Sequence, residues 1–249
     1  MTDSALLNLL PPLRRARGDR LYAGQKHWVD LWKQDGSWLL GRRPEGAAKE
    51  WKIQLDKGLT GWTPSLWPRR LEALVPRLIP GVAAVRIFRN ADRAPVLPVW
   101  RPWDGRLPSG DAWRLALPAG PAHAVAVAYG QGWKQPIPEH DATSPAEASS
   151  LVRAAADLLR LSADVRAVAA RAEMAAAFDR HIAPTGLFRR EGIWFSAVTD
   201  DYAGLFRALL EAGFLLNPDP DAPGVLAPLS DGEWATWKKA AEAWKEGRR

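Results

Sequence analysis

The sequence of 249 residues predicts a protein of the α/β class, and three observations support this prediction. Short runs rich in β-branched and aromatic residues alternate with longer segments of helical spacing. Capping signals precede two of the helical segments, at Ser144 and at Ser230. A hydrophobic content of 47% with a charged content of 25% is ordinary for a globular protein, so these elements can bury a common core.

The first predicted elements are two short strands, residues 20–22 and 26–31, which flank a turn at residues 23–25. Tyr22 and Trp28 are side chains that favour strands. A polar, Gly-containing segment then separates these strands from the next regular elements, as expected for a loop.

Two helices and a strand follow. Pro44 suits the first turn of one helix, and Gly58 suits the residue just past its end. Pro68 opens the second helix, whose apolar residues recur at a spacing that buries one face: Leu71, Leu74, Val75 and Leu78. Residues 82–88 are an apolar run of strand length, and the polar loop 89–93 follows them.

In this order of elements, residues 14–94 resemble the N-terminal part of the class III aminotransferases, and most closely the glutamate-1-semialdehyde aminomutase branch. The matching residues are Gly18, Leu21, Tyr22, Val29, Asp30, Leu40, Gly41, Lys57, Gly58, Leu59, Pro80, Val85 and Arg86. Residues 205–218 and 227–244 resemble the family's closing helix, strand and final helix. The resemblance implies the fold of the fold-type I pyridoxal-phosphate (PLP) transferases. It also implies a homodimer with its sites near the subunit boundary.

The resemblance fails in the middle of the chain. The family has a phosphate-binding loop after this strand, and here its positions are Asn90, Ala91 and Asp92. Ala91 replaces a glycine, and Asp92 puts a carboxylate where a dianion would lie. Only residues 95–144 stand where the family has the Asp and the Schiff-base Lys that hold its cofactor. We therefore interpret Asn90, Ala91 and Asp92 as a degenerate loop, and we expect no cofactor.

Lys134 is the only lysine of this central region. It follows a predicted strand at residues 122–129, and a loop after a strand suits a Schiff-base lysine. Because residues 135–138 contain prolines in place of the family's glycines, we favour a surface lysine and predict no other catalytic residue. His123 and His140 have no second ligand at metal-binding spacing, so we expect no metal site.

Two capping boxes organise the C-terminal half. Ser144 and Glu147 predict one long helix, with room for a kink, that ends near His181. Ser230 and Glu233 predict a final helix that ends near residue 246.

The predicted fold is a truncated fold-type I transferase, in which both chain ends build a small α+β domain beside a reduced central layer. It divides into a basic N-terminal arm (1–20), an aminotransferase-like N-terminal segment (21–94), a shortened Pro/Gly-rich central region (95–144) and an aminotransferase-like C-terminal segment (145–249). One core should hold apolar side chains from both ends: Val29, Leu31, Leu40, Phe206, Leu210, Phe214 and Leu216.

The positive charge gathers in the first part of the chain. Residues 1–94 carry 17 Lys and Arg against 9 Asp and Glu, whereas the remainder carries 17 against 19. The basic arm contains Arg14, Arg15, Arg17 and Arg20. Nucleic-acid binding is one interpretation of this arm. We favour a solvated arm, or one that docks on an acidic partner subunit, because no nucleic-acid motif accompanies the charge.

The chain has fourteen tryptophans. They could be exposed stacking platforms, but we favour core and interface fillers, and we expect a homodimer whose contacts come from residues 28–67.

Three functions remain open. We favour a catalytically inactive relative that works as a binding or structural protein; the alternatives are a divergent PLP-dependent aminotransferase or aminomutase and a basic nucleic-acid-associated protein. No apolar run is long enough to span a membrane, residues 1–10 lack the basic start of a signal peptide, and there is no cysteine. We therefore expect a cytoplasmic protein, and the high Ala, Arg and Pro usage is typical of bacteria.

Overall fold

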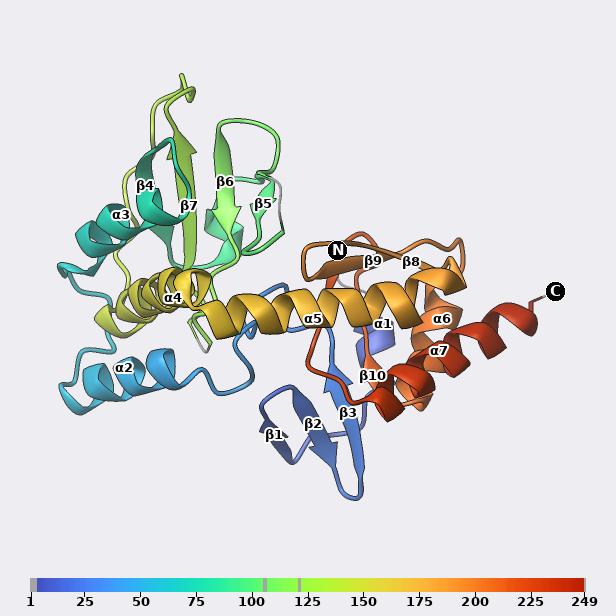
Figure 1. Cartoon of the computed structure of the whole chain (residues 1–249). Coiled ribbons are helices and arrows are strands. Elements are labelled where there is room, and N and C mark those ends of the chain that lie inside the picture. Colours follow the sequence, from blue (N-terminus) through green and yellow to red (C-terminus); the bar gives the residue numbers. More distant parts are fainter. Residues whose placement is uncertain (1–3, 105–106, 121, 249) are drawn as a thin grey trace. The chain divides into compact units, whose positions relative to one another are not determined.

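The computed structural model describes residues 4–104, 107–120 and 122–248, so residues 1–3 of the predicted arm lie outside it. The chain forms two compact units. The first, called here the terminal unit, takes residues 1–42, 103–105 and 165–249, and the second, called the central unit, takes residues 43–102 and 106–164. Figure 1 shows that each unit contains both helices and strands.

The main sheet of the terminal unit is built from both ends of the chain. Its strand order is β1 (Arg15–Arg17), β2 (Arg20–Ala23), β3 (Lys26–Asp30) and β10 (Phe214–Leu215). The first three strands are antiparallel neighbours, and β10 joins β3 in parallel with Phe214 opposite Val29. The small α+β domain predicted from the two chain ends is therefore confirmed.

A second, three-stranded sheet in this unit has the order β11 (Gly224–Val225), β9 (Trp194–Ala197) and β8 (Phe188–Glu191). Gly192 in the β8–β9 turn has a φ of 58°, and a Cβ there would lie 1.8 Å from the carbonyl oxygen of Trp103. Only glycine fits this turn. The sequence analysis did not identify this hairpin.

Four helices complete the terminal unit: α1 (Ser4–Leu7), α5 (Val165–His181), α6 (Tyr202–Glu211) and α7 (Asp231–Glu246). A short 3₁₀ turn, η2 (Ala183–Thr185), follows α5. The fully buried Trp237 of α7 lies at the centre of an aromatic core, with ring centroids 5.3–6.0 Å from those of four rings: Phe178, Phe188, Phe195 and Phe214.

The predicted common core is present, except that one predicted residue is replaced in it by its neighbour. Six of its seven side chains are buried in the terminal unit: Val29, Leu31, Phe206, Leu210, Phe214 and Leu216. Leu40 is only half-buried, and its neighbour Leu39 is buried instead. A left-handed turn at residues 33–35 lies between β3 and these leucines, so the side-chain direction could not be extrapolated from the strand.

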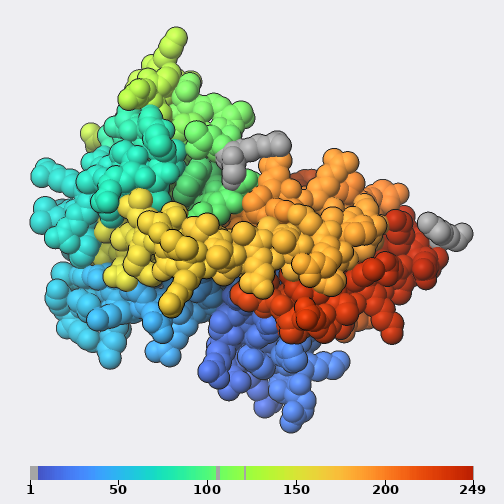
Figure 2. Space-filling view, viewed as in Figure 1, coloured from blue at the N-terminus to red at the C-terminus, as the bar shows by residue number. Residues whose placement is uncertain are grey.

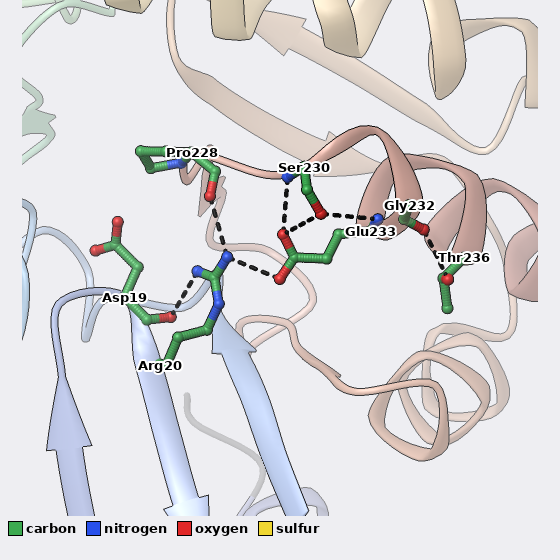
Figure 3. Close-up of polar contacts among 7 residues, drawn as sticks. All are labelled: Asp19, Arg20, Pro228, Ser230, Gly232, Glu233 and Thr236. Atoms are coloured by element: carbon green, nitrogen blue, oxygen red, sulfur yellow. Dashed lines mark hydrogen bonds and ion pairs between the residues drawn. The ribbon is translucent and has the colours of Figure 1, made fainter.

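Arg20 ties the β1–β3 ribbon to the C-terminal helix (Figure 3). Its guanidinium donates hydrogen bonds to the carbonyl oxygen of Pro228 at 3.1 Å and to Oε1 of Glu233 at 2.7 Å. The same Glu233 accepts hydrogen bonds from the backbone and hydroxyl of Ser230, which completes the predicted capping box of α7.

In its described residues, the central unit contains one four-stranded sheet and three helices. The strand order is β4 (Val82–Phe88), β7 (Val125–Gly130), β6 (Ala112–Leu115) and β5 (Val99–Trp100), all antiparallel except for the β5–β6 pair. The helices are α2 (Glu45–Asp56), α3 (Trp67–Leu78) and α4 (Pro145–Ala163), and α4 packs against the other two. The Pro/Gly-rich region thus contributes β5 and β6, two strands for which the sequence analysis made no prediction.

The long helix predicted to reach His181 is divided at Asp164, where ψ is 114°. One part, α4, belongs to the central unit, and the other, α5, belongs to the terminal unit. None of the helices formed by the described residues is long and apolar enough to cross a membrane.

Candidate functional site

Lys134 lies on the loop after β7 and is exposed, as are its neighbours Gln135 and Pro136. Within the described part of the chain, no hydrogen bond or ion pair joins Lys134 to the loop after β4. The structure therefore places this lysine where water has free access to it.

The loop after β4 is closed by polar contacts of its own residues. Asn90 caps a single 3₁₀ turn, η1 (Ala91–Arg93), by accepting a hydrogen bond from the backbone N–H of Arg93 at 3.1 Å. Ala91 and Asp92 are exposed. Two further donors of the loop point to one carboxylate from elsewhere in the central unit: Oδ2 of Asp141 accepts from the Arg89 backbone N–H at 3.0 Å and from Nε of Arg93 at 2.8 Å.

The carboxylate of Asp141 is held ionised by these contacts. Partial burial alone would raise its pKa, but the hydrogen bonds from the Arg89 backbone and the Arg93 side chain, with the charges of both arginines, lower the pKa below its usual value. A backbone N–H and a guanidinium at the end of a strand are donors that also suit an anion from solution.

This loop does not fit a cofactor phosphate. The two donors that face its anion position are already engaged by Asp141. A phosphate placed there would meet that carboxylate and the one on Asp92, and like charges at such distances repel. Ala91 also supplies no glycine for close backbone approach.

A pocket of about 600 Å³ lies beside this loop, and every residue that lines it belongs to the central unit. Charged residues line it from three segments: Arg69 and Glu72 from α3, Arg86 from β4, and Glu139 and Asp141 from the segment before α4. The rest of the lining comes from residues 63–68 and 139–143.

One wall of the pocket is a set of three linked side chains. Glu72 accepts a hydrogen bond from the guanidinium of Arg86, whose Nε also donates to the carbonyl of Pro138 at 2.8 Å. Nε2 of His140 lies 3.6 Å from Oε1 of the same Glu72. Nδ1 of His140 accepts the backbone N–H of Ile87 at 3.2 Å, so the ring proton lies on Nε2 when the imidazole is neutral.

His140 is a hydrogen-bond donor here, not a base. Burial and the charge of Arg86 lower the pKa of His140, while Glu72 opposes them in part, so the ring is neutral at pH 7. Its free electron pair is occupied by the Ile87 N–H. The pocket can therefore bind and orient a ligand, but the imidazole cannot accept a proton from it.

The sequence analysis discounted His140 as a metal ligand and did not consider Glu72 or Arg86 as a site. The one available signal was Arg86, a charge inside an otherwise apolar strand. No group of three or more His, Asp or Glu in the described residues is arranged to hold a metal ion.

The analysis also missed a buried lysine in the terminal unit. Lys33 is 2% exposed, pairs with Asp19 and lies in a turn in which Lys33, Gln34 and Asp35 all have left-handed φ angles of 45–56°. Burial, helped by the charge of Arg42, lowers the pKa of Lys33 to about 7. Arg42 is in turn paired with the fully buried Asp30, at 2.6 Å.

Comparisons with known proteins add the following. No protein-family model matches the chain. A curated relative, an uncharacterized protein of Treponema pallidum (strain Nichols), is 29% identical over 166 residues. The match covers 60% of this chain and 53% of the relative, so it spans about half of that protein's length.

Solved structures of aminotransferases resemble the chain over nearly its whole length. An omega-transaminase from Sphaerobacter thermophilus has a TM-score of 0.68 at 11% identity, with 96% of this chain and 92% of that chain covered. An ornithine aminotransferase from Plasmodium yoelii has a TM-score of 0.66 at 14% identity, with 100% of both chains covered. A β-phenylalanine aminotransferase from Variovorax paradoxus has a TM-score of 0.66 at 12% identity, with coverages of 98% and 93%. The chain therefore has an aminotransferase-like fold, as the sequence resemblance implied.

The expectation of no cofactor is contradicted by the same comparison. One structure that shares this fold is described as a transaminase with PLP bound, and another, the ornithine aminotransferase of Toxoplasma gondii, as having partial occupancy of PLP at its active site. The prediction rested on the loop after β4, on Lys134 and on the lack of the family's Asp in residues 95–144, and it is not retained.

Proposed function

We propose that this protein is a relative of the aminotransferases that does not transfer amino groups and that works as a binding protein. The observation that carries the proposal is the position of Asp141. Its carboxylate engages two donors of the loop after β4, the Arg89 backbone N–H and the Arg93 guanidinium, where the family resemblance implies a bound phosphate. The exposure of Lys134 also supports it, because a Schiff-base lysine works in a site shielded from water.

The ligand would bind in the pocket beside Asp141. Arg69 and the Nε2–H of His140 supply donors, and Glu72 and Asp141 supply acceptors. A small molecule that carries an anionic group next to a donor group fits this mixture of charges.

Binding of each member of a panel of small carboxylates is measured by ligand-detected NMR. Because Arg69 is exposed, we expect Arg69→Gln to weaken binding by several-fold, on the order of 1 kcal/mol. Arg77→Gln is the matched control, since Arg77 is an exposed arginine of the same helix that does not line the pocket. Equal losses of affinity in both variants would show that the ligand binds outside this pocket.

Catalysis is tested with purified protein, added PLP, an amino donor and a keto-acid acceptor. We expect no product above the rate of the cofactor alone. Turnover that disappears in Lys134→Ala and persists in Lys52→Ala, which removes another exposed lysine, would overturn the proposal. Tight binding of PLP without turnover is compatible with it.

A divergent PLP-dependent enzyme is the second candidate. The fold likeness to a transaminase with PLP bound favours it. Such an enzyme would need a lysine in a closed site, and the same assay decides between the two candidates.

We also propose that the protein is a homodimer in the cytoplasm. Support for the dimer comes from residues 55–66 of the central unit, where Leu55, Leu59, Trp62 and Leu66 are 39–66% exposed. Large apolar side chains gathered along one exposed segment are typical of an interface.

A further inference from the structure

The pairing of β1, β2 and β3 brings three side chains into one line across the ribbon. Arg15 lies opposite Tyr22, and Tyr22 lies opposite His27. Side chains at directly paired positions share a face of the sheet. The guanidinium carbon of Arg15 is 4.6 Å from the centroid of the Tyr22 ring, and the Tyr22 and His27 ring centroids are 6.0 Å apart at an angle of 35°. These three residues are called the Arg15–Tyr22–His27 row below.

The row faces solvent, while the other face of the ribbon is packed. Arg15 and His27 are exposed and Tyr22 is half-buried, whereas Leu21 and Trp28 on the opposite face are 1% and 6% exposed. In Figure 2 the ribbon, in dark blue, borders the red part of the same unit. The contacts of Arg20 with Pro228 and Glu233 fix its orientation (Figure 3).

The arginines near the row are not neutralised by the protein. Arg14, Arg15 and Arg17 are exposed, and in the described ranges of the chain none of them forms an ion pair. By contrast, Arg20 is paired with Glu233. The uncompensated charge of the N-terminal residues is therefore concentrated on β1, the edge strand of this sheet.

A hollow adjoins one end of the row. Its volume is about 550 Å³, and its lining includes Leu9, Pro11, Lys26, His27 and Trp28. A flat group that stacks on the His27 ring has room in this hollow to extend past the edge of the ribbon.

We propose that the Arg15–Tyr22–His27 row binds single-stranded nucleic acid, with the bases on the Tyr22 and His27 rings and the phosphates on Arg14, Arg15 and Arg17. Aromatic rings on an exposed sheet face stack with unpaired bases of any sequence, and neighbouring guanidinium groups hold the backbone. An acidic peptide or a phosphate polymer would use the charges but not the rings, so the rings favour a nucleic acid. This surface belongs to the terminal unit and is independent of the pocket in the central unit.

The test measures the binding of a fluorescent oligothymidylate to the full chain by anisotropy, over a series of salt concentrations. We expect affinity to fall steeply with salt, because bound cations are released. Tyr22→Leu removes the ring and keeps every charge. It should weaken binding about 5-fold or more with the salt slope unchanged, since a base loses its stacking partner while every charge stays. His27→Leu, at a more exposed position, should act in the same direction.

Arg15→Gln and Arg17→Gln should each lower the salt slope by about one unit. Arg166→Gln is the matched control, because it removes an exposed arginine of the same unit far from the ribbon in sequence. Circular dichroism of each variant shows whether the ribbon still folds, and His27→Leu keeps the test valid if Tyr22→Leu does not fold.

The second arm compares the oligothymidylate with an abasic oligonucleotide of equal length, with polyphosphate and with an acidic peptide. Weaker binding of all three supports base stacking. Equal binding of any of them would overturn the proposal in favour of a plain cationic patch. An absence of oligothymidylate binding at low salt would overturn it as well.

Discussion

At the scale of single residues, the chain buries charged groups and pairs each with a partner. Asp30 is fully buried against Arg42, and Lys33 is buried against Asp19. A buried charge costs several kcal/mol unless a partner compensates it. The three left-handed residues 33–35 each add backbone strain of roughly 1 kcal/mol, so this turn is stable only because its surroundings hold it.

Replacement of Lys33 by methionine tests the effect of burial on its amine. The pKa of Lys33 is lowered from 10.5 to about 7, so between these values the unfolded chain binds a proton that the folded chain does not. The free energy of unfolding of the wild type should therefore rise with pH across this window relative to Lys33→Met. Urea unfolding at several pH values measures the difference. Lys26→Met, at an exposed position, should leave the slope unchanged, and equal slopes for Lys33→Met and the wild type would contradict the prediction.

Replacement of Asp141 by asparagine tests the closure of the loop after β4. We expect a loss of about 1–2 kcal/mol at pH 7, because a charged acceptor of two hydrogen bonds becomes neutral. Since the pKa of Asp141 is lowered in the folded state, its stabilisation is present above the unfolded value of 3.8 and is lost as the pH falls through the folded pKa.

The wild type and Asp141→Asn should thus differ at neutral pH and converge in acid, as measured by urea unfolding. Asp92→Asn is the control, since Asp92 is exposed in the same loop. A difference that persists in acid would show that the loop depends on something other than this carboxylate.

At the scale of elements, helix ends follow local capping chemistry. The hydroxyl of Ser144 accepts the N–H of Glu147 at 3.2 Å, and the hydroxyl of Ser230 accepts the N–H of Glu233 at 3.3 Å. Each cap satisfies a backbone donor that the first turn leaves unpaired. At Ser230 the cap does more, because Glu233 also holds Arg20 and so links α7 to the ribbon.

Ser230→Ala should destabilise the terminal unit by about 1 kcal/mol, because the N–H of Glu233 loses its acceptor. Chemical denaturation followed by tryptophan fluorescence measures this, since α7 carries the buried Trp237. Thr236→Ala changes an exposed hydroxyl of the same helix and should leave stability nearly unchanged. If the two variants behave alike, the cap contributes nothing.

At the scale of the whole molecule, the two chain ends meet in one sheet, and residues 43–102 and 106–164 between them form a second unit. The parallel pairing of β10 with β3 joins residues that are nearly two hundred positions apart. The exposed apolar residues of segment 55–66 belong to the central unit and lie far in sequence from both chain ends.

If residues 55–66 form a dimer contact, light scattering at micromolar concentration should give twice the mass of 27.4 kDa. Trp62→Glu combined with Leu66→Glu should give the single-chain mass, because each substitution puts a charge into the proposed interface. Val165→Glu, at an exposed apolar position of the terminal unit, is the control. A single-chain mass for the wild type would refute the dimer.

The sequence by itself determined the elements whose signals are local. Pro44 and Gly58 bracket α2, Pro68 opens α3, and the Ser230 box starts α7, because caps and turns act within a few neighbouring residues. The order of these elements was enough to identify the fold. The shared core of the two chain ends followed from the family resemblance, and the structure pairs β3 near the start of the chain with β10 near its end.

The tertiary structure alone decided what depends on distant partners. β6 forms in a proline-rich stretch because β7 pairs with it, and β5 in turn pairs with β6. The β8–β9 turn is fixed by the backbone of Trp103. Asp141 accepts a hydrogen bond from Arg89, 52 positions away, and the buried Lys33 pairs with Asp19, 14 positions away. Burial and charge pairing depend on positions in space, and no local pattern in the sequence encodes them.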